Sequence, residues 1–354
     1  MTTLVDPQRL IRFGSQVLAS LGVPADDSRL VADSLVTADL WGHPSHGMLR
    51  LPWYVARLRS GVMRPQTRPE PVADLGAVAV LDGRDGIGQV IADLATCSAV
   101  DRAQTHGVGV VAVRNSNHFG TAAYWTRRMA DRGCVGILTT NGSPAMAPWG
   151  GTRKTVGANP WSVATPGGSH PPVVLDIANT SVARGKIYAA AQRGETIPDT
   201  WVIDEHGTPT TDPNVAVHGL LAPMAGHKGY GISFVMDVLS GVLTGSGYAT
   251  DVAGPYVPDQ LSRCGHLILA LRIGAFLPEQ DFAARIDDLI SRTKVVPKAP
   301  GVAEILYPGE PEARAERGGR ADGVRLPERT VAELSDLGAS CGVPFKDTVL
   351  AGTA

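Results

Sequence analysis

Apolar residues recur at helical spacing through the N-terminal part of the chain. Leucine, isoleucine and valine side chains fall on one face of residues 7–21 and again of residues 26–40. This spacing is typical of a helix that packs one face on a core. Pro7 stands where the first turn of a helix tolerates proline. The pattern therefore predicts two amphipathic helices.

Short apolar runs bounded by glycine or polar residues follow, and they predict strands. The runs are residues 108–113, 135–140, two between 155 and 181 (the second ending at Asp176) and 266–273. Helical patterns lie between and after them, over residues 121–133, 182–194, 282–290 and 328–340. A ribbon over residues 197–213 is predicted to turn at Gly207, which supplies a positive φ. Strands that alternate with helices in this way predict an α/β fold.

Residues 226–245 (GHKGYGISFVMDVLSGVLTG) contain an apolar run with a single charge, Asp237. Apolar side chains cover most of the helix circumference, which predicts a buried helix. Its glycine-rich first turn leaves backbone N–H groups exposed beside Lys228, an arrangement that suits an anion. The alternative is a glycine-rich start to a core helix with a solvated Lys228, and the segment alone favours neither.

Composition narrows the class of protein. The chain has 354 residues, of which 44% are hydrophobic and 19% charged, with a formal net charge of −2. The absence of a lysine or arginine block argues against a nucleic-acid or membrane-surface partner. The four cysteines form no CxxC pair, and no signal peptide or membrane-spanning run is present in the sequence. We expect a soluble, cytoplasmic protein.

Polar chemistry first gathers in the segment WGHPSHGMLR, with His43, Ser45, His46 and Arg50. We expect a helix to begin near His46, which would place His46 and Arg50 on one face. An imidazole beside a guanidinium suits a small carboxylic acid, because arginine grips the carboxylate while histidine exchanges a proton. The alternatives are a helix start capped by Ser45 and a metal site through His43 and His46. No cysteine or carboxylate lies nearby at ligand spacing, so no metal is expected.

Two loops after predicted strands carry further polar residues: Asn117 and His118, then Asn141 and Ser143. Ligands of α/β proteins collect beyond the carboxyl ends of strands, so these loops are candidates for the site. The earlier GxG at residues 86–88 has Ile91 at its third position and is predicted to be a tight turn, without a dinucleotide.

Seven segments together resemble one family. They are ADLWGHPSHGMLRLPWYVARLRSG, SNHFG, GANPWSVATP, DIANTSVARGKI, IPDTWVIDEHGTPTTDP, GHKGYGISFVMDVLSGVLTG and LYPGEPEARAE. Their order and content resemble the type-2 malate/L-lactate dehydrogenase family. That family includes ureidoglycolate and sulfolactate dehydrogenases, 2,3-diketogulonate reductase and Δ1-piperideine-2-carboxylate reductase.

The resemblance implies an α/β fold with a three-layer mixed sheet and helices, and a nicotinamide-binding domain that is not a Rossmann fold. It implies a substrate and dimerisation domain over residues 1–119 with about 300–354, an NAD(P)-binding domain over about 120–299, and a homodimer. The implied activity is hydride transfer between NAD or NADP and C2 of a small 2-hydroxy or 2-oxo acid. The alternatives are reduction of a cyclic imino acid and, more remotely, a metal-dependent hydrolase or a binding protein without activity.

The resemblance also implies residue roles. His46 and His118 are the acid/base candidates, either of which could exchange the proton. Substrate contacts are implied for Ser45, Arg50 and Asn117. The implied cofactor contacts are Gly142, Ser143, Asp176, Ile177, Ala178, Thr180, His227, Lys228, Gly309 and Glu310. Two departures from the family pattern are Asp237, where glutamate is usual, and the sequence from Asp176 to Thr180, which leaves the choice between NAD and NADP open.

Overall fold

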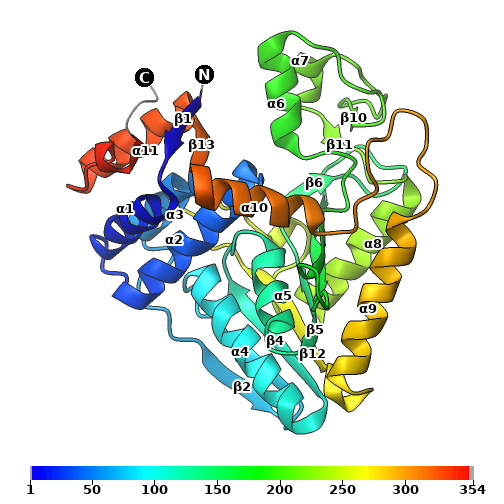
Figure 1. Cartoon of the computed structure of the whole chain (residues 1–354). Coiled ribbons are helices and arrows are strands. Elements are labelled where there is room, and N and C mark those ends of the chain that lie inside the picture. The colour runs from blue at the N-terminus through cyan, green and yellow to red at the C-terminus, as the bar shows by residue number, and fades with distance from the viewer. Residues whose placement is uncertain (1, 351–354) are drawn as a thin grey trace.

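A seven-stranded sheet organises the molecule (Figure 1). The structure is a computed structural model that describes residues 2–350. The strand order is β2-β3-β4-β12-β5-β8-β9. The strands are β2 (Glu70–Asp74), β3 (Val78–Asp82), β4 (Val108–Ser116), β12 (Cys264–Arg272), β5 (Cys134–Thr140), β8 (Trp161–Thr165) and β9 (Val173–Ile177). Only β3 and β4 pair in parallel and the other neighbours are antiparallel, which confirms the predicted mixed α/β sheet.

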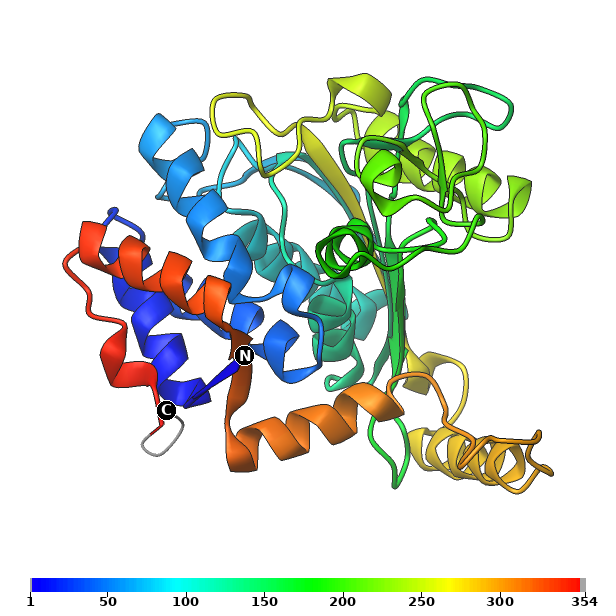
Figure 2. The same cartoon turned by 90° about the horizontal axis from the view of Figure 1, so that it is seen from above.

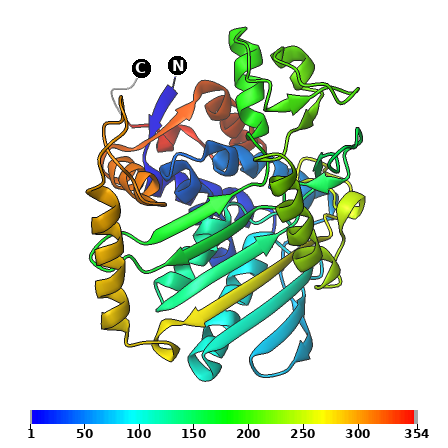
Figure 3. The same cartoon turned by 90° about the vertical axis from the view of Figure 1, so that its right-hand side faces the viewer.

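Helices lie on both faces of this sheet. α4 (Gly88–His106) and α5 (Ala122–Ala130) cover one face, and α8 (His227–Asp237) and the following π-helical turn (Val238–Val242) lie against the other (Figures 2 and 3). Glycines allow the close approach on each side. A Cβ at Gly109 would lie 1.9 Å from the Ala99 carbonyl oxygen of α4, and one at Gly265 would lie 1.7 Å from the Ser240 carbonyl oxygen.

The two ends of the chain meet in a separate helical core. β1 (Thr2–Val5) pairs with β13 (Val324–Pro327), so residues 324–350 pack on the N-terminal helices. The helices of this part are α1 (Pro7–Ala19), α2 (Ala25–Leu40), α3 (Leu51–Ser60), α10 (Glu310–Asp322) and α11 (Glu328–Ser340). The first two confirm the predicted amphipathic pair. The predicted domain boundary near residue 119 passes between β4 and β5, which are both strands of the seven-stranded sheet.

A small lobe built from residues 144–157 and 180–221 has a core of its own. Its elements are β6 (Pro144–Met146), β7 (Val156–Gly157), α6 (Arg184–Arg193), β10 (Val202–Ile203), α7 (Pro213–Ala216) and β11 (Leu220–Leu221). Gly207 has a φ of +84°, as the predicted turn requires. α9 (Glu279–Lys294) runs beside the β9 edge of the seven-stranded sheet (Figure 3).

The prediction of a buried helix over residues 226–245 is wrong. Five apolar side chains of this segment are 39–63% exposed in the chain: Phe234, Val235, Val238, Val242 and Leu243. The pattern correctly predicts a helix with apolar side chains around most of its circumference, but only one side of the segment packs on the sheet. Within residues 2–350, no helix has the length and apolar character needed to cross a membrane.

Candidate functional site

The segment that carries His46 and Arg50 is a pair of short 3-10 turns, Pro44–His46 and Met48–Arg50, and α3 begins only at Leu51. The expected helix start near His46 is therefore wrong. Gly47 interrupts the segment with extended backbone, at φ −87° and ψ −153°.

Asp39 of α2 causes this interruption. Its Oδ2 accepts the N–H of Met48 at 2.8 Å, and its carboxylate fills the space beside Gly47, where a Cβ would lie 2.0 Å from Oδ1. Burial raises the pKa of Asp39 to about 7, although the hydrogen bond from Met48 acts in the opposite direction. The carboxylate thus shapes the turn that presents His46 and Arg50.

His118 lies in the loop between β4 and α5, as predicted. The hydroxyl of Tyr54 on α3 is 2.6 Å from Nδ1 of His118, and the N–H of Gly120 approaches the same nitrogen at 3.3 Å. Gly88, at the start of α4, has no room for a side chain, because a Cβ would lie 2.3 Å from the carbonyl oxygens of both Asn117 and His118. The GxG turn at residues 86–88 therefore packs directly against the His118 loop.

The structure brings the two histidines together. The rings of His46 and His118 stack, with centroids 5.8 Å apart and planes at 20°. Nδ1 of His46 is 2.9 Å from the Ser45 hydroxyl, which fixes the ring of His46. Burial, and then the charge of Arg50, lowers the pKa of His46 to about 4. Burial and the neighbouring His46 lower the pKa of His118 well below its usual range. Both rings are therefore neutral near pH 7.

Arg50 stands beside this pair. Its Nε donates to the Ser45 carbonyl oxygen, and its guanidinium lies over the ring of Trp53, 3.8 Å from the centroid. No described residue forms a salt bridge with it. Burial lowers the pKa of Arg50, but a guanidinium keeps its charge in proteins. Arg50 is thus an unpaired cation next to two neutral imidazoles, which is an arrangement that can bind a carboxylate.

Asn117 is placed differently from the other substrate candidates. It is fully buried, its Oδ1 accepts from Arg57 at 3.0 Å, and its Nδ2 donates to the Gly86 carbonyl oxygen at 2.8 Å. These bonds hold the His118 loop against α3 and against the GxG turn before α4. Its predicted contact with substrate stays a prediction.

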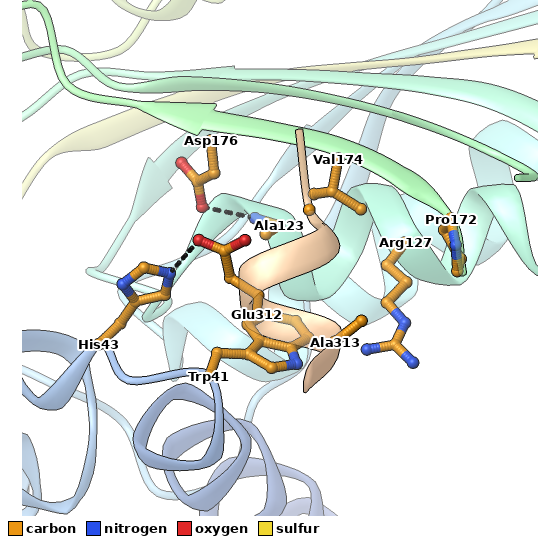
Figure 4. A pocket seen from close by; sticks show the side chains of 10 residues that line it. Trp41, His43, Ala123, Arg127, Pro172, Val174, Asp176, Glu312 and Ala313 are labelled. Carbon is orange, nitrogen blue, oxygen red and sulfur yellow. Dashed lines mark hydrogen bonds and ion pairs between the residues drawn. The ribbon is translucent and has the colours of Figure 1, made fainter. Parts of the chain in front are cut away.

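Asp176 and Gly309 line one pocket together with His43 (Figure 4). Asp176 accepts the N–H of Ala123 at 2.7 Å and so caps α5, while burial raises its pKa to about 6. His43 faces Glu312 across the same pocket, with 3.5 Å between Nε2 and Oε1. Nε2 of His43 thus has a carboxylate as its neighbour. Within residues 2–350, no three His, Cys, Asp or Glu side chains gather as metal ligands.

Glu310 and Thr180 are engaged within the chain. Glu310 accepts hydrogen bonds from Lys294 at 2.6 Å and from Arg314 at 2.5 Å. The hydroxyl of Thr180 donates to the Val182 carbonyl oxygen. Ala178 is exposed and Ile177 half-buried at the end of β9.

The remaining cofactor candidates lie at the N-terminus of α8 and in the loop after β5. His227 and Lys228 are both exposed, and their backbone N–H groups have no hydrogen-bond acceptor among the described residues. Gly226 precedes them at a φ of +67°, and no side chain caps the helix. Gly142 has open space where a Cβ would stand, and the hydroxyl of Ser143 is 3.3 Å from that of Tyr256. The turn predicted to suit an anion is therefore accessible.

Two residues near His118, Tyr54 and Arg57, are not indicated by the sequence pattern. They lie on α3 and are 1% exposed. Their spacing of three residues places both on one helix face, but the sequence does not show that this face meets the His118 loop.

Comparisons with known proteins identify the family of the chain. A model of the malate/L-lactate dehydrogenase family matches residues 5–335. The L-sulfolactate dehydrogenase of Methanocaldococcus jannaschii is 36% identical over 346 residues, covering 98% of this chain and 99% of that protein. The solved sulfolactate dehydrogenase structure from that organism matches with a TM-score of 0.93 over 98% of this chain and 99% of that one.

The names of two further relatives include a cofactor. The ureidoglycolate dehydrogenase (NAD(+)) of Escherichia coli K12 is 33% identical over 87% of this chain and 88% of that protein. The (2R)-3-sulfolactate dehydrogenase (NADP(+)) of Chromohalobacter salexigens is 34% identical over 94% of this chain and 98% of that protein. Because these similarities span almost the whole chain, this protein belongs to the malate/L-lactate dehydrogenase family.

Proposed function

We propose that the protein is an NAD(P)-dependent oxidoreductase that interconverts a small 2-hydroxy acid and its 2-oxo acid. The observation that carries this proposal is the cluster of His46, His118 and Arg50. Two neutral imidazoles and one unpaired guanidinium meet in a partly buried place, although His118 is distant in sequence from the other two. Each has a task in oxidation and reduction at the carbon next to a carboxylate.

Arg50 binds the substrate carboxylate. The Ser45 carbonyl oxygen accepts from its Nε, and the guanidinium plane lies on the ring of Trp53. Because these contacts already restrict the side chain, binding costs little further conformational entropy. The fixed fork sets the orientation of C2 toward the histidines. Ser45 has a supporting role, because its hydroxyl is 2.9 Å from Nδ1 of His46.

His118 exchanges the proton with the oxygen on C2, and His46 polarises that oxygen. A neutral His118 accepts the hydroxyl proton when the hydroxy acid is oxidised, and its imidazolium form returns it on reduction. The charge of Arg50 lowers the pKa of both histidines. A carboxylate bound to Arg50 offsets this charge, so that substrate binding favours the protonated histidine that reduction needs.

The residues around α8 fit a dinucleotide. The free N–H groups of His227 and Lys228, the positive end of the helix and the lysine charge suit its pyrophosphate, and Gly142 leaves room for close approach. Ser143, Asp176, Ile177, Ala178, Thr180, Gly309 and Glu310 complete the proposed cofactor contacts. When bound, NAD or NADP supplies or accepts the hydride. The proposed cofactor site lies outside a Rossmann motif, in keeping with the GxG turn that packs under the His118 loop.

The domain division, the homodimer and the cytoplasmic location are part of the same proposal. The exposed apolar face of α8 and the π-helical turn supports a homodimer, because solvent exposure of five large apolar side chains is unfavourable. The half-buried outward side chains Ile137, Val163 and Leu269 on the same side of the sheet extend this face.

The experiment that tests the function follows reduced-nicotinamide absorbance with NADH and with NADPH. The reductive panel is pyruvate, oxaloacetate, sulfopyruvate, 2,3-diketogulonate and Δ1-piperideine-2-carboxylate, and ureidoglycolate is tested in oxidation. Turnover of a 2-oxo or 2-hydroxy acid supports the proposal. Turnover of the cyclic imine alone selects the alternative substrate class, and failure to bind either cofactor contradicts the function.

A further inference from the structure

The loop that carries His118 is held by one face of α3. Tyr54 contacts the imidazole itself, and Arg57, three residues later, binds the side chain of Asn117, next to His118 in sequence. Arg57 also donates to the carbonyl oxygens of Val257 and Gln260. Both side chains are 1% exposed, so their contacts are shielded from water.

The two contacts to the His118 ring are on the same nitrogen. Tyr54 and Gly120 both approach Nδ1, and within residues 2–350 the ring makes no other hydrogen bond. Nε2 is therefore the nitrogen left for a substrate. A hydroxyl can serve Nδ1 either as donor or as acceptor, whereas the N–H of Gly120 can only donate to it.

A second buried side chain is close to this hydroxyl. Gln89, near the start of α4, is 0% exposed, and neither its Oε1 nor its Nε2 makes a hydrogen bond of ordinary geometry. Burial raises the pKa of Tyr54, while the amide of Gln89 is near enough to act in the opposite direction. The phenol therefore stays protonated, with an unused amide next to it. An unpartnered buried amide is costly unless it gains a partner in another state of the protein.

We propose that Tyr54 is a positioning residue for His118: it accepts the Nδ1–H in the forms of the ring that exchange a proton at Nε2, and it donates to Nδ1 in the resting ring, with Gln89 as the acceptor of its hydroxyl hydrogen in the first case. This inference rests on the proposed function. When Nδ1 is bare, the Tyr54 hydroxyl donates to it. When Nδ1 carries hydrogen, that N–H donates to the Tyr54 oxygen, and the hydroxyl turns to Oε1 of Gln89.

The proton balance of the step is simple. On reduction, the Nε2–H bond of the His118 imidazolium breaks and an O–H bond forms on the substrate oxygen, which becomes the hydroxyl of the product. His118 is left neutral with its remaining hydrogen on Nδ1, shared with Tyr54. Oxidation is the reverse. Tyr54 keeps its own hydrogen throughout, so no tyrosinate forms.

Tyr54→Phe is the test. The imidazolium loses an acceptor for its Nδ1–H, so the protonated form is destabilised and the pKa of His118 falls further. We expect kcat to fall about 10- to 100-fold. The pH at which kcat/KM for reduction is half-maximal should move down by about one unit. Gln89→Leu should change the profile in the same direction by less, and the cofactor KM should stay the same in both variants.

Tyr124→Phe is the matched control. Tyr124 is also buried, and its hydroxyl donates to Asp33 at 2.6 Å, away from the histidines. We expect it to lower stability without moving the pH profile. An unmoved profile in Tyr54→Phe would overturn the proposal, because a merely structural tyrosine would behave in this way.

A second measurement does not need turnover. The ring-nitrogen NMR signals of His118, assigned with the help of His118→Ala, should move in Tyr54→Phe and stay in place in Tyr124→Phe. If the wild-type protein turns over no substrate, the proposed function fails. The Nδ1 signal then still decides whether Tyr54 controls the ring, and an unmoved signal overturns that control.

Discussion

The carboxylate of Asp39 occupies the space in which a side chain at Gly47 would stand, with 2.0 Å between Oδ1 and the position of a Cβ. This contact links α2 to the turn between His46 and Arg50, and the bond from Met48 to Oδ2 fixes its direction. The geometry of the proposed substrate site thus depends on a carboxyl group of another helix.

The first prediction concerns pH and Asp39. Its pKa is about 7 in the folded chain and about 3.8 when exposed, so the unfolded chain loses the proton first as pH rises. Stability therefore falls between about pH 4 and pH 7 on account of this group. Asp39→Asn should remove that part of the slope and stabilise the protein at pH 8 by roughly 1–3 kcal/mol. The free energy of unfolding, measured with urea across this pH range for both proteins, checks this prediction.

Asp101→Asn is the control for this prediction, because Asp101 is exposed and pairs with Arg132 on the surface. It should leave the slope as in the wild type. An Asp39→Asn protein with the wild-type slope would show that Asp39 is ionised in the folded state at neutral pH.

The second prediction separates the two histidines. His118→Ala should lower kcat by roughly 10²–10⁴-fold, since it removes the group that exchanges the proton. His46→Ala should lower kcat less, because it removes only polarisation of the oxygen. Steady-state kinetics in both directions measure this, with the exposed His206→Ala as control. A loss of only a few-fold in His118→Ala, with the larger loss in His46→Ala, would reverse the roles.

The third prediction concerns the carboxylate. Arg50→Ala should reduce kcat/KM for the acid substrate by about 10²-fold, because a charge-assisted contact to the substrate is lost. Arg50→Lys should recover part of it, as it keeps the charge but loses the fork and the stack on Trp53. Cofactor affinity, measured by NADH fluorescence, should not change. Arg59→Ala, on the exposed side of α3, is the control, and unchanged kinetics in Arg50→Ala would exclude Arg50 from substrate binding.

The fourth prediction concerns assembly. Val238→Asp places a charge in the centre of the exposed apolar face of α8 and the π-helical turn, and burial of that charge between two chains is unfavourable. Light scattering after size exclusion should show a dimer for the wild type and a monomer for the variant. Leu94→Asp, at a comparably exposed leucine on α4, should stay dimeric. A wild-type monomer would contradict the proposed homodimer.

Local sequence determined much of this protein. Periodicity gave α1, α2 and the main strands, because helix and strand spacing depend on near neighbours in the chain. The order of polar motifs was enough for the family, and for the expectation that His118 lies in a loop beyond a strand.

Only the tertiary structure decided how these parts meet. The turn at His46 depends on Asp39 of another helix, and the side chain of Asn117 is occupied by Arg57 from α3. The contact between Tyr54 and His118 joins residues far apart in sequence. A helix that is apolar all round has the same pattern whether it lies in a core or on an exposed face, so the pattern of residues 226–245 predicts a burial that the chain does not show. The periodicity of a segment shows which of its positions are apolar. The packing of distant segments decides which of those positions are covered.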